Sequence, residues 1–270
     1  MQRRPWLDRR LFLGILAGQA LAVHARGEDD DFDPMPLDAE VASRYALYAM
    51  LASNAYHRAD RVRFPLERLG WQQVDMQGRP TREPTYEDKD SGLAFDIHHH
   101  TGRGESIFAF RGTDDRHDFT HANLAVWPFP GQYQQAREYF QAYASRLPGR
   151  KFTLTGHSLG GGLALGVSVS HGHDAVVFNS SPRVFDGLGD NYADARRVMV
   201  YEGGEFLSAV RKLWKRKFLH IVPRENIYRA AFEYERGVNR HRSDQLALGL
   251  LRLGAMVDSD LAGVLGVLPG

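Results

Sequence analysis

Apolar residues recur at helical or strand spacing along most of the chain from residue 40 onward. Side chains that repeat every three to four positions predict helices over residues 40–56, 132–147, 205–220, 228–236 and 243–256. Alternating or continuous apolar runs predict strands at Trp71–Met76, Leu93–His100, Ser106–Arg111, Lys151–Thr155, Ala175–Phe178 and Arg197–Tyr201. Strands that alternate with helices predict an α/β fold with one mostly parallel central sheet and helices on both faces.

The first 25 residues have the pattern of an export signal. An arginine pair precedes an apolar run, Leu11–Val23, that is too short to span a bilayer. This pattern predicts that residues 1–25 are a twin-arginine-like signal peptide. We therefore expect a bacterial protein that is periplasmic or secreted. An amphipathic N-terminal helix on a cytoplasmic protein is the alternative. The acidic residues 26–38 are expected to form a flexible leader, and residues 39–270 a single domain.

Ser158 stands at the centre of a Gly-x-Ser-x-Gly pattern that includes Gly156 and Gly160. A strand-like run precedes it, and small or apolar residues suited to a tightly packed helix follow it. Such a pattern forms the nucleophile elbow of serine hydrolases, whose backbone leaves no room for a Cβ at the glycine positions. The alternative is a glycine-rich turn with an incidental serine, which has no reason to flank the serine symmetrically. The context predicts that Ser158 is a nucleophile.

A serine hydroxyl needs a general base to react near neutral pH. His241 lies in a polar loop just before the last predicted helix, where the histidine of this architecture belongs. His220 is the competing candidate, although its apolar neighbours also fit a half-buried structural histidine. The acid that orients the base is expected just after the strand 197–201, where either Glu202 or Glu205 could reach it. Both glutamates also fit a solvated loop.

Composition excludes several other kinds of chemistry. The formal net charge is +1, so no overall field recruits nucleic acid. The chain has no cysteine, and therefore neither a disulfide nor a cysteine-ligated metal site can form. His98 and His100 share one face of a predicted strand, but no carboxylate stands at ligand spacing, and we expect no metal. Ester hydrolysis by an activated serine needs no cofactor.

Three ordered segments resemble the signatures of the class 3 (fungal-type) lipase family. They are Phe108–Thr113, Gly156–Gly161 and Phe178–Val184. That family has the α/β-hydrolase fold and acts on acyl esters of glycerides and phospholipids. The similarity extends from about residue 40 to about residue 250.

The resemblance implies roles for individual residues. It makes Thr113 one donor of the oxyanion hole, while elbow geometry independently makes the backbone N–H of Leu159 the other. Glu205 falls where the family has an aspartate, and Glu202 remains the alternative acid. His241 matches the final histidine of the family.

Two segments allow two interpretations each. Trp127 and Phe129 stand where the family has a lid helix, and they fit either a rim that contacts the acyl chain or core packing. The basic, aromatic stretch 211–218 fits either docking on an anionic phospholipid surface or a solvated helix face.

These patterns predict an exported serine carboxylic-ester hydrolase, a lipase or phospholipase that cleaves acyl esters of lipids. A hydrolase of small soluble or polymeric esters is the alternative with the same mechanism. A non-catalytic protein of the hydrolase fold, which binds lipid or a protein partner, is the alternative from another class.

Overall fold

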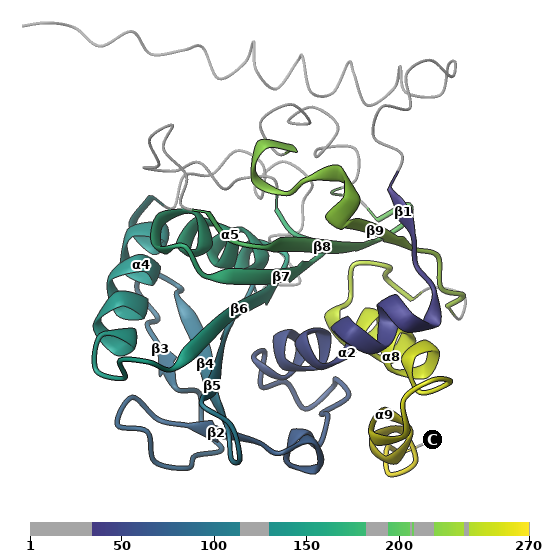
Figure 1. The fold of residues 1–270 in the computed structure, drawn as a ribbon, viewed down its shortest axis with the longest axis horizontal. Helices are drawn as coiled ribbons and strands as arrows, with labels where there is room; N and C mark the ends of the chain where they lie inside the picture. The colour runs from purple at the N-terminus through teal and green to yellow at the C-terminus, as the bar shows by residue number, and fades with distance from the viewer. Residues whose placement is uncertain are drawn as a thin grey trace, which may run out of the picture. The chain divides into compact units, whose positions relative to one another are not determined.

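The computed structural model describes residues 34–113, 130–181, 194–205, 207, 219–234 and 238–269 (Figure 1). The predicted signal peptide, Trp127, Phe129 and the stretch 211–218 lie outside these residues. None of the helices within the described ranges has both the length and the apolar character needed to cross a membrane.

The described strands form one sheet in the order β1-β9-β8-β7-β6-β5-β4-β2, with β3 paired to β4. They are β1 (Met35–Pro36), β2 (Trp71–Val74), β3 (Tyr86–Glu87), β4 (Ala94–His100), β5 (Glu105–Phe110), β6 (Lys151–His157), β7 (Asp174–Phe178), β8 (Arg197–Glu202) and β9 (Ile227–Ala230). All pairings from β5 to β9 and on to β1 are parallel, whereas β2 and β3 pair antiparallel to β4, and β4 to β5. The predicted α/β-hydrolase fold is confirmed.

Helices cover both faces of this sheet. They are α2 (Ala39–Asn54), α4 (Pro130–Ala144), α5 (Leu159–His171), α8 (Ser243–Gly254) and α9 (Ser259–Leu265), with short 3-10 turns η1 (Leu66–Leu69) and η2 (Arg224–Asn226). Figure 1 shows α4 and α5 on one face, and α2 with α8 and α9 on the other. The first described helix, α2, packs directly against α8 near the end of the chain.

Alternation along β5 supplies both layers of the core. Ile107 and Ala109 are buried in the cluster that contains α2 and α8. The intervening Phe108 faces the other layer, where its ring centroid lies 5.2 Å from that of Phe140 in α4. The side-chain period of two therefore explains why this strand has no polar position between Ile107 and Phe110.

One prediction about local structure is wrong. Residues 228–236 were expected to be helical, yet Ile227–Ala230 is strand β9, because its β-branched and aromatic residues fill the space beside β8. Within residues 26–38, which the sequence predicts to be a leader, Met35–Pro36 pairs with β9. Asp38 caps α2, since its Oδ1 accepts a hydrogen bond of 2.8 Å from the N–H of Val41.

Asp244 ties the start of α8 to the chain that follows α2. Its buried carboxylate accepts two hydrogen bonds from Arg242, at 2.9 and 2.6 Å, and one of 3.4 Å from the N–H of Val62. Burial raises the pKa of this carboxyl, but Arg242, the Val62 N–H and Arg61 together outweigh burial and hold the pKa below its usual value of 3.8. The ionised form is therefore the stabilising one.

We expect Asp244→Asn to lower the free energy of unfolding by about 2 kcal/mol at pH 7, because Arg242 loses its charged partner. A carboxyl whose folded pKa is depressed stabilises fully above its unfolded pKa, and this stabilisation disappears as the pH falls through the folded pKa. Urea unfolding at pH 7 and at successively more acidic pH measures this, and the difference between wild type and variant must shrink in acid. Exposed Asp90→Asn is the control. An equal loss in both variants contradicts the assignment.

Candidate active site

Ser158 lies at a sharp turn between β6 and α5. Its φ of 58° and ψ of −125° are values that a residue with a Cβ rarely adopts. Hydrogen bonds hold the strained turn against the end of β7: the Ser158 N–H donates to the Phe178 carbonyl at 3.0 Å, and the Ser181 N–H donates to the Ser158 carbonyl at 2.9 Å. The backbone thus has the elbow geometry that the sequence pattern predicts.

The two flanking glycines are required by close backbone packing. A Cβ on Gly156 would collide with the backbone of Gly160. A Cβ on Gly160 would collide with the carbonyl of Phe110 at the end of β5. In neither case is the obstacle a flexible side chain, so the backbone itself would have to move.

We expect Gly160→Ala to lower the free energy of unfolding by about 3 kcal/mol and to displace Ser158, because the added methyl forces β5 and α5 apart. Gly263→Ala is the matched control, since a Cβ there meets nothing within 4 Å and α9 favours alanine by about 0.5 kcal/mol. Thermal unfolding and ester turnover measure the pair. An unchanged Gly160→Ala protein would contradict the tight-elbow geometry.

Three side chains that are far apart in the sequence meet at this turn. The Oγ of Ser158 lies 2.9 Å from Nε2 of His241, and Nδ1 of His241 lies 2.8 Å from Oε2 of Glu205. The residues are 1%, 3% and 4% exposed, respectively. The Glu205 carboxylate also accepts a hydrogen bond of 2.9 Å from the N–H of Leu207, which fixes its orientation toward the imidazole.

Glu202, the alternative acid, contacts different partners. Its carboxylate is fully buried at the end of β8, where it accepts hydrogen bonds from the Phe232 N–H at 3.2 Å and the Tyr234 hydroxyl at 2.8 Å. Arg240, the residue before His241, pairs with it at 3.4 Å. Burial raises the pKa of Glu202 more than Tyr234 and Arg240 lower it. The interpretation of both glutamates as solvated loop residues is wrong, because both are buried.

His220, the competing base, is exposed and belongs to the helical turn 219–221. Ser158, His241 and Glu205 are buried, whereas the His220 side chain is exposed. The structure thus brings together His241 and Glu205 with Ser158, and leaves His220 apart from them.

The segment expected to supply one oxyanion donor runs against the elbow. A Cβ on Gly112 would collide with the carbonyl of His157 and would lie 3.2 Å from the Cβ of Ser158, so Thr113 follows directly beside the nucleophile. The Oγ1 of Thr113 is buried and has no hydrogen-bond partner among the described residues. Leu159 is the first residue of α5, so its N–H has no acceptor within the helix.

A supporting network around the imidazole was not predicted from the sequence. The His157 ring centroid lies 4.7 Å from that of His241, and Nδ1 of His157 lies 2.9 Å from the Tyr56 hydroxyl. Arg61 stacks 4.1 Å over the Tyr56 ring and donates a 2.7 Å hydrogen bond to the hydroxyl of Ser243. The signal for His157 was its place in the elbow pattern, whereas nothing in the sequence marks Tyr56 or Arg61. No group of three or more potential metal ligands occurs in the part of the chain that the structure describes.

Comparison with known proteins places the chain in a family. Residues 47–212, more than half of the chain, match the phospholipase-like family described as a Tle-like phospholipase domain. The chain belongs to this Tle-like phospholipase family. The prediction of a lipase-like family is confirmed at this level.

Solved structures similar to this Tle-like chain include lipases of fungi. The Lip2 lipase from Yarrowia lipolytica is 15% identical with a TM-score of 0.43, over 66% of this chain and 76% of that one. The lipase from Rhizopus microsporus var. chinensis is 16% identical with a TM-score of 0.43, over 69% and 77%. The Rhizomucor miehei lipase propeptide complex is 12% identical with a TM-score of 0.45, over 69% and 73%. No curated protein matches the chain by sequence.

Proposed function

We propose that this protein hydrolyses acyl esters of lipids, with Ser158 as nucleophile, His241 as general base and Glu205 as the acid that orients the base. The observation that carries the proposal is the continuous chain of short contacts from Glu205 through His241 to Ser158 on a strained elbow. Membership in a phospholipase-like family supports lipase or phospholipase activity and thus a lipid ester as substrate.

The arrangement fits acyl transfer in two steps. Ser158 Oγ attacks the ester carbonyl carbon while Nε2 of His241 takes the hydroxyl proton, and the protonated imidazole then gives this proton to the leaving alcohol. Water attacks the acyl-enzyme with the same base, which releases the fatty acid and restores the serine. The Glu205 carboxylate accepts a hydrogen bond from the Nδ1–H of His241, so the free lone pair of Nε2 faces Ser158. The same carboxylate stabilises the transient imidazolium.

The tetrahedral intermediate needs hydrogen-bond donors for its oxyanion. In this proposal the donors are the N–H of Leu159, at the positive end of α5, and Thr113 beside the elbow. Loss of one such donor typically raises the barrier by about 3 kcal/mol. The buried Oγ1 of Thr113, which has no partner among the described residues, is available for this contact.

Hydrolysis of phospholipid vesicles by the purified protein tests the substrate class. The expected result is fatty-acid release from phosphatidylcholine and phosphatidylglycerol vesicles, detected by mass spectrometry, at a rate that exceeds turnover of monomeric short-chain esters. Hydrolysis of soluble esters without any rise at the lipid interface supports the alternative of a soluble-ester or polyester hydrolase.

We also propose that residues 1–25 direct export and are removed from the mature protein. The support is the arginine pair followed by the short apolar run in the sequence. N-terminal sequencing of protein recovered outside the cytoplasm tests this, and the expected first residue lies near Arg26. An intact N-terminus on exported protein, or retention in the cytoplasm, would overturn the proposal.

A further inference from the structure

A cavity of about 310 Å³ opens on the α2 side of the sheet edge formed by β2 and β4. Its lining includes Arg63, Phe64, Trp71, Gln73, Arg82 and His98. None of the five residues assigned above to ester hydrolysis lines it. The volume is at the lower end of the range for small-molecule sites, which begins at about 300 Å³. The cavity therefore fits a small ligand or one part of a larger one.

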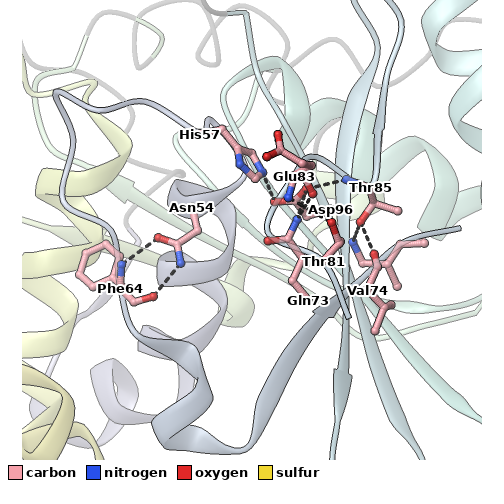
Figure 2. Close-up of polar contacts among 10 residues, drawn as sticks. Asn54, His57, Phe64, Gln73, Val74, Thr81, Glu83, Thr85 and Asp96 are labelled. Carbon is pink, nitrogen blue, oxygen red and sulfur yellow. Dashed lines mark hydrogen bonds and ion pairs between the residues drawn. The ribbon is translucent and has the colours of Figure 1, made fainter. Parts of the chain in front are cut away.

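Two buried hydrogen-bond networks fix the walls of this cavity (Figure 2). On one side, Asn54 near the end of α2 accepts a hydrogen bond of 2.9 Å from the Phe64 N–H and donates one of 2.8 Å to the Phe64 carbonyl. Both ends of its amide are thus used to hold the chain segment that carries Arg63. The wall position of this segment is set before any ligand arrives.

On the other side, the buried carboxylate of Asp96 organises β2 and the loop that follows it. Figure 2 shows Gln73 Nε2 donating to Asp96 at 3.0 Å and to the Glu83 carbonyl at 2.7 Å. Asp96 also accepts from the Thr85 N–H at 3.1 Å and lies 2.7 Å from Nε2 of His57. These bonds hold the loop that carries Arg82 against the sheet.

The charged groups of the lining are mainly cationic. Arg63 and Arg82 come from different segments, one before β2 and one after it, and neither forms an ion pair with another described residue. Among the described residues of the lining, Glu67 is the one acidic side chain. Two guanidinium groups without carboxylate partners leave ten N–H donors in all that a ligand can use.

His98 adds a neutral polar group to the wall. The residue is 3% exposed, and its Nδ1 has no hydrogen-bond partner within the described ranges. Burial lowers the pKa of His98 to about 4, so the ring is uncharged at neutral pH. A buried polar atom without a partner costs stability. An apolar residue at this position would avoid that loss of stability, so the presence of His98 points to a role in binding.

We propose that this cavity binds the phosphate group of a phosphate ester, with Arg63 and Arg82 as its cationic ligands. A carboxylate offers two oxygens in one plane, whereas the additional oxygens of a phosphate can face two guanidinium forks from different directions at once. The phosphate can belong to a soluble ester or to a phospholipid headgroup. Binding here does not depend on the proposed chemistry at Ser158.

The test measures binding in the full chain carrying Ser158→Ala, so lipid probes stay intact and activity does not enter the readout. Calorimetry with glycerol 3-phosphate tests the soluble source, and co-sedimentation with phosphatidylglycerol vesicles tests the headgroup. Arg63→Ala/Arg82→Ala is compared with Arg68→Ala/Arg103→Ala, which removes two exposed charges outside the cavity lining.

The cavity variant is expected to weaken binding of one of these probes at least about tenfold, while the control changes it less than about twofold. Loss for glycerol 3-phosphate identifies a soluble ester, and loss for vesicles alone identifies a headgroup. Equal weakening in both double variants reveals non-specific attraction and overturns the proposal. The proposal is also overturned if the protein that still carries both arginines binds neither glycerol 3-phosphate nor the vesicles. Failure of Ser158 to act on esters leaves these results unaffected.

Discussion

Ser158→Ala is expected to lower kcat for ester hydrolysis at least about ten-thousandfold, because no other group can form the acyl-enzyme. The nucleophilic Oγ, 2.9 Å from His241, is lost, while the change removes only one oxygen from a side chain that is 1% exposed. The fold should therefore be retained. Ester turnover and circular dichroism of the two purified proteins measure this result.

A fluorophosphonate probe supplies an independent readout of the same residue. Wild type is expected to become covalently labelled at Ser158, and the alanine variant to remain unlabelled. Labelling of neither protein would support the alternative that this is a non-catalytic hydrolase-fold protein. Labelling of both would place the reactive serine elsewhere.

Glu205→Gln is expected to lower kcat by about a thousandfold to ten-thousandfold with little change in KM. A glutamine can turn its amide N–H toward Nδ1 of His241, which favours the tautomer that carries its proton on Nε2. That proton then faces Ser158 and prevents the ring from acting as a base. Steady-state kinetics on a monomeric ester measure this change.

Glu202→Gln is the matched control, because it makes the same chemical change at a second buried glutamate near the same histidine. Glu202 contacts Tyr234 and Arg240 rather than His241, so we expect a loss in kcat of less than about tenfold. Burial also raises the pKa of Glu202 and penalises its charged form. Replacing this carboxyl with a neutral amide is therefore expected to change the site less than the same replacement at Glu205. If the two variants lose activity equally, Glu205 is not the acid.

Much of the fold follows from local sequence patterns. The strands over residues 94–100, 105–110 and 151–157 are recognisable because β-branched and aromatic residues alternate or run continuously there. The helix predicted over residues 228–236 is wrong where residues 228–230 belong to β9, since apolar spacing over so few residues fits either period. The segment forms a strand because it pairs with the edge of β8, and this pairing cannot be deduced from the local sequence.

The elbow could be predicted because its geometry constrains neighbouring residues. Gly156 and Gly160 are needed where the backbone passes within contact of other backbone, and this requirement leaves a mark in a short stretch of sequence. The choice between Glu202 and Glu205 leaves no such mark. It depends on the directions in which the two glutamate side chains point. Tyr234 and Arg240, which lie later in the chain, donate hydrogen bonds to the carboxylate of Glu202.

The cavity at the sheet edge illustrates the same limit. Arg63 and Arg82 are separated by β2 in the chain and have no pattern in common, so only the folded arrangement shows that they line one space. Asp96 and Gln73 are polar residues within predicted strands, and side chains of these types usually face solvent. The structure instead buries both and uses them to hold the cavity wall.

The packing of α2 against α8 affects when the protein can act during its synthesis. Ser158 and Glu205 leave the ribosome before His241, and α2 cannot pack against α8 until residues 243–254 have been made. A nascent chain that ends before residue 241 holds the serine without a base and exposes one apolar face of α2. The pairing of α2 with α8 therefore requires that residues 243–254 have been made. The three side chains of the proposed site can come together only after His241 has been made.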